Sequence, residues 1–152
     1  MIEMSRTIPM NDGTEPALTV DDVWSGLEEK ARNPLPYVKA ITACTVVEEF
    51  EGGLIRDIEH QGPVREVVTF YPKKRVHFVR THGRARGTID NEIITDENGE
   101  DALRFTFRIV VDGIEDGSPA ETAIGEEMSN DYLDAVHTTL AAVRERIVLA
   151  RA

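Results

Sequence analysis

The chain has 152 residues, of which 41% are hydrophobic and 30% are charged, and its formal net charge is −11 at pH 7. This length suits one domain with a substantial core. An acidic surface repels nucleic acids and anionic membranes, so we expect neither as a partner. No stretch approaches the ~20 apolar residues of a membrane span, and the first residues lack the apolar run of a signal peptide. We therefore expect a single cytoplasmic domain over residues 1–152.

The first third of the chain predicts one strand and two short helical segments. Residues 5–11 suit a strand whose proline marks it as a sheet edge. Thr19 and Asp22 have the spacing of a capping box, and an apolar face at helical spacing follows them. Residues 34–41 then suit a second short helix or a helical turn.

Six strands are predicted next, because no helical pattern interrupts a series of alternating segments and turns. Short turns rich in glycine, proline and asparagine separate the segments, and strands joined by such turns run antiparallel. The alternation is clearest in the last strand, where five apolar side chains share one face. The approximate ranges are 42–50, 53–61, 63–71, 74–82, 86–95 and 102–112.

The last segment predicts one long helix. Ser118 and Glu121 mark its start with the spacing of a second capping box, and an apolar stripe runs from Met128 to Ile147. A helix of about 25–30 residues is roughly 40 Å long and would cross the domain. The order of elements predicts an α+β fold in which a curved seven-stranded antiparallel sheet wraps around the C-terminal helix, with two short helices between strands 1 and 2.

Five stretches carry a resemblance to a known family: 18–24 (LTVDDVW), 33–38 (NPLPYV), 65–72 (REVVTFYP), 75–78 (RVHF) and 103–107 (LRFTF). The order of elements resembles the helix-grip fold of START-like (SRPBCC, pollen-allergen-like) proteins. Within that superfamily the chain resembles the AtaL-like family, long catalogued as a domain of unknown function, from about residue 5 to residue 147. The resemblance implies a hydrophobic ligand cavity and brings no catalytic motif with it.

Strand alternation indicates which side chains would line such a cavity. We expect walls that are mostly apolar, with a few polar groups to orient the ligand. The predicted ligand-binding residues are Arg56, Val68, Phe70, Phe78, Arg80, Asn91, Ile93, Phe105, Phe107, Met128, Tyr132, Val136 and Thr139.

Several polar residues allow two interpretations. Arg56 and Arg80 are candidate anchors for a carboxylate or phenolate, because a guanidinium binds such groups bidentately. The alternative is an ion pair with Glu66 or another acid, since buried arginine is usually paired. His82 is a general-base candidate if it faces the cavity, and otherwise an inert histidine beside a turn. Tyr132 either bonds a ligand oxygen or packs in the core.

The sequence leaves three functions open. The first is a non-enzymatic protein that binds a small hydrophobic or aromatic metabolite. The second is a small-molecule enzyme, by analogy with the polyketide cyclases and aromatases that share the helix-grip fold. The third is an interaction module with a filled interior, which a cavity below roughly 300 Å³ would favour. We predict no metal site, because the histidines and the one cysteine show no ligand spacing. We also predict no cofactor and no catalytic residue, because the sequence has no phosphate-binding glycine loop and no Gly-x-Ser-x-Gly motif. A homodimer through the exposed sheet edges or the apolar back of the sheet is left open.

Overall fold

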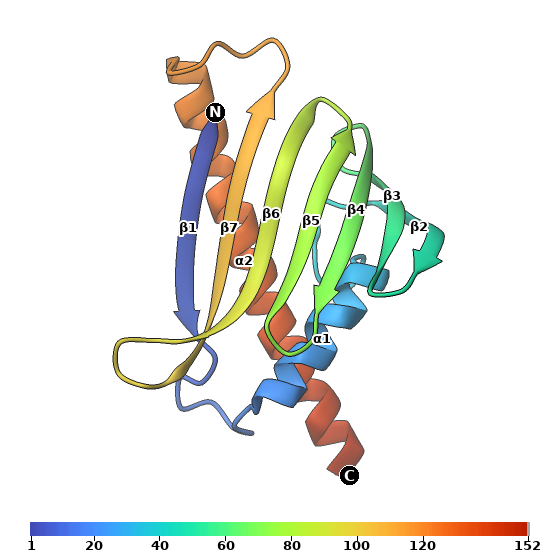
Figure 1. The fold of residues 1–152 in the computed structure, drawn as a ribbon. Helices are drawn as coiled ribbons and strands as arrows, with labels where there is room; N and C mark the ends of the chain where they lie inside the picture. Colours follow the sequence, from blue (N-terminus) through green and yellow to red (C-terminus); the bar gives the residue numbers. More distant parts are fainter. Residues whose placement is uncertain (152) are drawn as a thin grey trace.

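Seven antiparallel strands form one curved sheet in the order β1-β7-β6-β5-β4-β3-β2. Figure 1 shows this sheet in the computed structural model, which describes residues 1–151, with both helices on its concave side. The predicted sheet-and-helix architecture is confirmed. The elements are β1 (Ile2–Pro9), α1 (Val20–Arg32), β2 (Ala43–Phe50), β3 (Gly53–Glu59), β4 (Pro63–Tyr71), β5 (Arg75–His82), β6 (Ala85–Thr95), β7 (Asp101–Val111) and α2 (Pro119–Arg151).

Two details differ from the sequence-based expectation. β1 begins at Ile2 and ends at Pro9, earlier than the predicted range of 5–11. Residues 34–41 form hydrogen-bonded turns, in which the Val38 amide donates to the Pro34 carbonyl at 2.9 Å. The helical-turn alternative is therefore the one observed, and no second regular helix forms in these residues. Two prolines in the segment oppose a regular helix, since each lacks an amide donor and restricts the residue before it.

The start of α1 follows the predicted pattern. The Thr19 hydroxyl accepts a hydrogen bond from the Asp22 amide at 3.2 Å, and the Asp22 carboxylate accepts one from the Thr19 amide at 2.9 Å. This capping box satisfies two amides that the first helical turn leaves unpaired. Neither described helix is both long and apolar enough to span a bilayer.

The two helices cover the sheet unevenly. α2 packs on β1 and β7, and α1 packs on β5 and β6, whereas β3 and β4 have little helix over them. The helices cross at Gly26, where an added Cβ would lie 2.4 Å from Val143 Cγ2. Only glycine permits so close a crossing, because that distance is far inside van der Waals contact. This placement leaves space beside β3 and β4 for a site.

Candidate functional site

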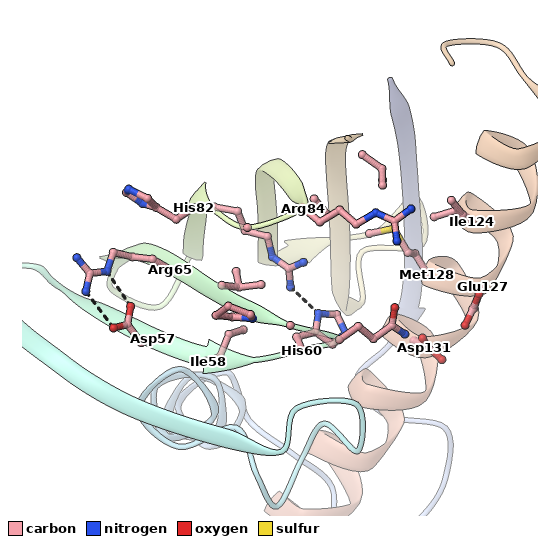
Figure 2. Close-up of a pocket in the computed structure, with 18 residues that line it drawn as sticks. Asp57, Ile58, His60, Arg65, His82, Arg84, Ile124, Glu127, Met128 and Asp131 are labelled. Carbon is pink, nitrogen blue, oxygen red and sulfur yellow. Dashed lines mark hydrogen bonds and ion pairs between the residues drawn. The ribbon is translucent and has the colours of Figure 1, made fainter. Parts of the chain in front are cut away.

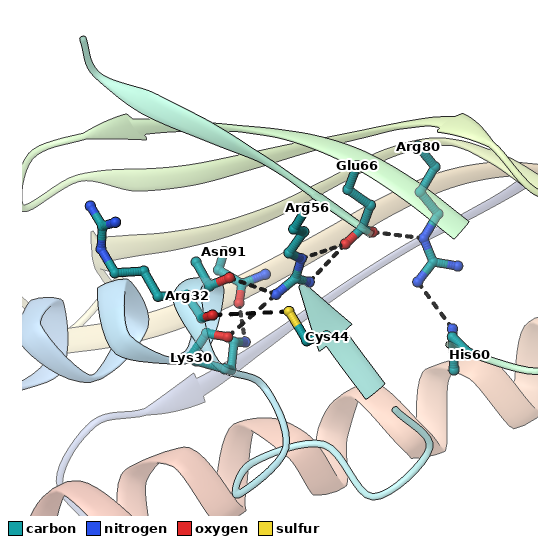
Figure 3. A network of polar contacts seen from close by, with 9 residues as sticks. Lys30, Arg32, Cys44, Arg56, His60, Glu66, Arg80 and Asn91 are labelled. Carbon is teal, nitrogen blue, oxygen red and sulfur yellow. Dashed lines mark hydrogen bonds and ion pairs between the residues drawn. The ribbon is translucent and has the colours of Figure 1, made fainter. Parts of the chain in front are cut away.

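Three neighbouring strands place charged side chains on the concave face. Arg56 of β3 pairs in register with Glu66 of β4, which pairs with Arg80 of β5. All three side chains are at most 5% exposed. Glu66 accepts a hydrogen bond from Arg56 Nε at 2.9 Å and one from Arg80 Nε at 2.8 Å, as Figure 3 shows. Of the two interpretations of these arginines, the structure shows the ion pair with Glu66.

Carbonyl groups at the end of α1 accept further hydrogen bonds from Arg56. Arg56 Nη1 donates to the Ala31 carbonyl at 2.8 Å, in the last turn of α1. The carbonyl end of a helix carries partial negative charge, so this position favours a cation. The guanidinium also lies over the Phe78 ring, 5.1 Å from its centroid. The protein itself thus supplies most of the partners of Arg56.

Lys30 joins this group from α1 and is only 8% exposed. Its Nζ donates to the Asn91 side-chain oxygen. Burial, together with the nearby Arg56 charge, lowers the pKa of Lys30 to about 8. Sequence reasoning missed this residue, although a signal was present. Lys30 follows Val23 by seven residues and Leu27 by three, which places it on the buried face of α1.

The charged groups shift the pKa values of their neighbours. Burial opposes the charge of Glu66, but the two guanidiniums outweigh it and hold the pKa of this carboxyl below its ordinary value. Burial and the Arg80 charge lower the pKa of His60. Arg80 Nη2 lies 3.1 Å from His60 Nδ1. Because arginine has only donors, His60 accepts this hydrogen bond, which a neutral imidazole can do.

A cavity of about 60 Å³ lies between these charged groups and α2. It has room for about four water-sized groups, which is well below the roughly 300 Å³ of a small-molecule site. The interior is therefore mostly filled with side chains. Eight of the thirteen predicted ligand-binding residues line this inner cavity: Arg56, Phe78, Arg80, Asn91, Phe105, Met128, Tyr132 and Val136.

The other five predicted residues do not line the inner cavity. Helices and neighbouring rings fill the space beside them. Phe107 packs against the ring of Tyr132 at a centroid distance of 5.1 Å, and Phe70 meets Trp24 edge-on at 6.3 Å. Strand alternation identifies the inward face correctly, but it cannot show how deeply a helix fills that face. The five residues are Val68, Phe70, Ile93, Phe107 and Thr139.

A larger cleft of about 750 Å³ opens beside the inner cavity, at one end of the sheet (Figure 2). The β3–β4 turn, the β5–β6 turn and the N-terminal half of α2 form its walls. Its volume lies within the range of roughly 300–1,000 Å³ for small-molecule sites. The outer cleft and the inner cavity share a wall, which consists of His60, Arg80, Met128 and Asp131.

His82 lies at the outer cleft and not in the interior. The pairing of β4 with β5 shifts between Arg65 and Glu66, so the alternation that turns Arg80 inward does not continue to His82. His82 is exposed, and its Nδ1 lies 2.8 Å from the Thr81 hydroxyl. The structure thus places His82 beside the β5–β6 turn, as the second interpretation expects, and not in the lining of the inner cavity.

The Tyr132 hydroxyl is buried and has no hydrogen-bond partner within residues 1–151. Burial raises the pKa of Tyr132, while the nearby Arg80 charge acts in the opposite direction. The side chain is therefore a neutral phenol at physiological pH, able to donate one hydrogen bond. At the wall of the outer cleft, burial raises the pKa of Asp131, and the neighbouring Glu127 adds to the effect. Among the described residues, no group of three or more histidine, cysteine or acidic side chains is placed to hold a metal ion.

Several solved structures share this fold. The Zhui aromatase/cyclase from Streptomyces sp. R1128 has a TM-score of 0.73 and 13% identity, covering 95% of this chain and 94% of that one. The di-domain ARO/CYC StfQ of the steffimycin pathway has a TM-score of 0.72 and 13% identity over 96% of this chain, which spans only 52% of StfQ. A START superfamily protein from Mycobacterium smegmatis has a TM-score of 0.63 and 14% identity, covering 95% and 98% of the two chains. These similarities confirm the predicted helix-grip fold, and at such identities they show the fold alone.

Sequence comparison defines the family. No curated protein sequence matches the chain. The family described as acetylaranotin biosynthesis cluster protein L, or AtaL, matches residues 4–148. This match covers nearly the whole chain and confirms the resemblance found in its five sequence stretches. The chain therefore belongs to the AtaL family.

Proposed function

We propose that the protein binds a small, largely apolar or aromatic metabolite, with the body of the ligand in the outer cleft and one polar end in the inner cavity. The observation that carries this proposal is the wall that the two spaces share, at His60, Arg80, Met128 and Asp131. The outer cleft alone is large enough for a typical ligand, and the inner cavity alone is not. A ligand that uses both would reach past Arg80 into a polar pocket.

The lining of the outer cleft suits such a ligand. Aliphatic and thioether side chains contribute apolar surface from several elements, among them Ile58, Val64, Val111, Ile124 and Met128. Apolar walls supply most of the affinity of a small-molecule site, and a few polar groups fix the orientation of the ligand. The names of Zhui and StfQ as aromatase/cyclases agree with an aromatic or polyketide-like ligand class.

The first test is to identify what the protein carries and where. Native mass spectrometry of protein from its own source would detect a small molecule that purifies with it. Calorimetry with a panel of polycyclic aromatic compounds would then measure binding. We expect Met128→Trp, which places a large ring at the shared wall, to abolish binding. Val148→Trp adds the same ring to the exposed far end of α2 and should leave binding unchanged.

Two results would contradict the proposal. The first is protein that is empty when purified and binds no compound of the panel. The second is binding that Met128→Trp does not affect, because the ligand would then lie elsewhere.

A second candidate function is an enzyme of the aromatase/cyclase type. The observation that favours it is the Tyr132 hydroxyl, a proton donor that has no partner within residues 1–151. It shares the inner cavity with Arg80 and the neutral His60. A cation and a proton donor together can polarise a carbonyl and protonate an enolate. A ligand recovered after incubation with unchanged mass and an unchanged NMR spectrum supports a carrier. A ligand that is converted by the wild type, but bound and not converted by Tyr132→Phe, supports an enzyme.

A further inference from the structure

The lining of the inner cavity holds more buried positive charge than negative charge. Lys30, Arg56 and Arg80 are each at most 8% exposed. Within residues 1–151, Glu66 is the one buried acid on this lining, and the two arginines already bond both of its oxygens. Asp131 also reaches the lining, but it is exposed at the shared wall. Buried charge is strongly unfavourable without a counter-charge, so this lining favours the binding of an anion.

Hydrogen-bond donors at the cavity also lack acceptors. The Tyr132 hydroxyl has no partner among the described residues. Arg80 donates from Nε to Glu66 and from Nη2 to His60. Lys30 uses one of its three donors. Buried donors are nearly always satisfied in folded proteins, so an acceptor is expected here.

The space fits a small acceptor group and excludes a ring. A volume of about 60 Å³ holds about four water-sized groups, which is enough for a carboxylate. The neighbouring groups have the protonation states that an anion requires. With a pKa of about 8, the Lys30 amine is mostly protonated at neutral pH. Tyr132 keeps its proton because burial raises the pKa of its hydroxyl.

We infer that the inner cavity is an anion subsite, which takes the carboxylate or enolate oxygen of an otherwise apolar ligand. The anionic oxygen accepts hydrogen bonds from Tyr132 and Arg80 and neutralises the charge of Lys30. This inference rests on the proposed function, because it places the body of the same ligand in the outer cleft. It narrows the ligand class from apolar molecules in general to organic acids and stabilised enolates.

The test compares two compounds of nearly the same shape, 2-naphthoate and 2-naphthamide, by titration calorimetry at pH 7. Only the first carries a negative charge. We expect naphthoate to bind at least about tenfold more tightly, since a charge-assisted hydrogen bond is about twice as strong as a neutral one. Tyr132→Phe should lower naphthoate affinity about tenfold and change naphthamide affinity by less than about twofold.

Two lysine variants test whether the preference for the acid depends on the buried charge of Lys30 or on the positive charge of the protein in general. Lys30→Met should reduce the preference for naphthoate, whereas Lys39→Met, which removes an exposed lysine, should not. The preference of the wild type should also fall as the pH rises above about 8, because Lys30 then loses its proton. Circular dichroism establishes that each variant folds. If Lys30→Met does not fold, Tyr132→Phe decides the question, because it removes a single oxygen that has no partner among the described residues.

The outcomes distinguish this inference from the function on which it rests. If acid and amide bind equally well, or if Tyr132→Phe keeps the full preference for the acid, the anion subsite is overturned and the binding function stands. If neither compound binds, and the rest of the aromatic panel also fails, the proposed function falls and the anion subsite falls with it.

Discussion

The concave face of the sheet has two unlike halves. Over β7, the inward positions Phe105 and Phe107 are at most 1% exposed, and they pack directly against α2. Over β3, β4 and β5, the corresponding positions are Arg56, Glu66 and Arg80. The inner cavity lies where the two halves meet, since Phe105 and Arg80 both line it, and the outer cleft adjoins the charged half at Arg80.

This difference indicates that the apolar half stabilises the fold and that the charged half contributes to ligand binding. Well-packed apolar side chains in place of a buried ion pair are often neutral or stabilising, so stability alone does not explain three buried charges in a row. The packed half provides the favourable free energy of burial that offsets the cost of the charged half. Function is therefore to be sought on the charged half.

We expect the largest effect on stability when the carboxylate of Glu66 is removed. Glu66→Gln leaves Arg56 and Arg80 buried without their counter-charge. We expect the free energy of unfolding to fall by about 3–5 kcal/mol, as is typical of breaking a buried pair. Denaturant titration measures this change. The matched control is Asp57→Asn, which breaks the exposed pair of Asp57 with Arg65 and should have no measurable effect.

The effect of Glu66→Gln on stability should also depend on pH in the acid range. The folded-state pKa of Glu66 is depressed below its ordinary value of 4.5, so its stabilisation is complete above that pH and is lost as the pH falls through the folded-state pKa. The stability difference between the wild type and Glu66→Gln should therefore shrink in acid. A difference that stays constant from neutral pH to below 4 would contradict the buried charged triad.

Lys30 gives the next largest effect, and its dependence on pH falls in the alkaline range. Its amine loses its proton at about pH 8 in the folded protein and at its ordinary value of 10.5 in the unfolded chain. Between these values the unfolded state binds more protons, so the free energy of unfolding rises with pH. Relative to Lys30→Met, the wild type should gain about 3 kcal/mol across this window, as measured by denaturant titration at each pH. Parallel pH profiles of the two proteins would show that Lys30 is not buried.

The packing of the helices is tested at Gly26. Gly26→Ala places a methyl group 2.4 Å from Val143 Cγ2, which forces α1 and α2 apart. We expect a loss of about 1–3 kcal/mol in thermal or denaturant unfolding, as for other overpacked sites. Gly125→Ala is the control on α2. Its methyl group meets Ile2 at 3.2 Å, and the gain in helix propensity of about 1 kcal/mol should offset much of the strain. Equal effects of the two variants would contradict the close crossing at Gly26.

The smallest effect on stability is expected at Tyr132. Tyr132→Phe removes a buried hydroxyl that has no partner in the part of the chain that the structure describes. Unfolding should be unchanged or should require up to about 1 kcal/mol more, because an unsatisfied polar group is unfavourable in the interior. A clear loss of stability would mean that the hydroxyl is hydrogen-bonded within the free protein.

Much of this arrangement follows from strand alternation. The period of two places Arg56, Glu66, Arg80 and Asn91 on the inward faces of their strands, as the structure shows. The ligand-anchor and ion-pair interpretations of the arginines could not be separated from the sequence, because the choice depends on the register between strands. That register brings Glu66 between the two arginines.

Other features could not be predicted from a pattern. The register shift beside Glu66 interrupts the alternation and leaves His82 outside the inner cavity. No residue type in the sequence predicts this shift. The space that remains under the sheet depends on how closely α1 and α2 approach it, which is a property of packing. Lys30 is the exception, since helical periodicity alone places it on the buried face of α1.

The most direct test uses the methionine methyl groups as reporters of where a ligand binds. Met128 lies in the wall shared by the inner cavity and the outer cleft, whereas Met10 is fully buried in the packed core. In a titration of methyl-labelled protein with 2-naphthoate, followed by NMR, we predict that the Met128 signal shifts to saturation and the Met10 signal does not. A saturable shift at Met10 with Met128 unmoved would place the ligand in the other half of the molecule and contradict the account.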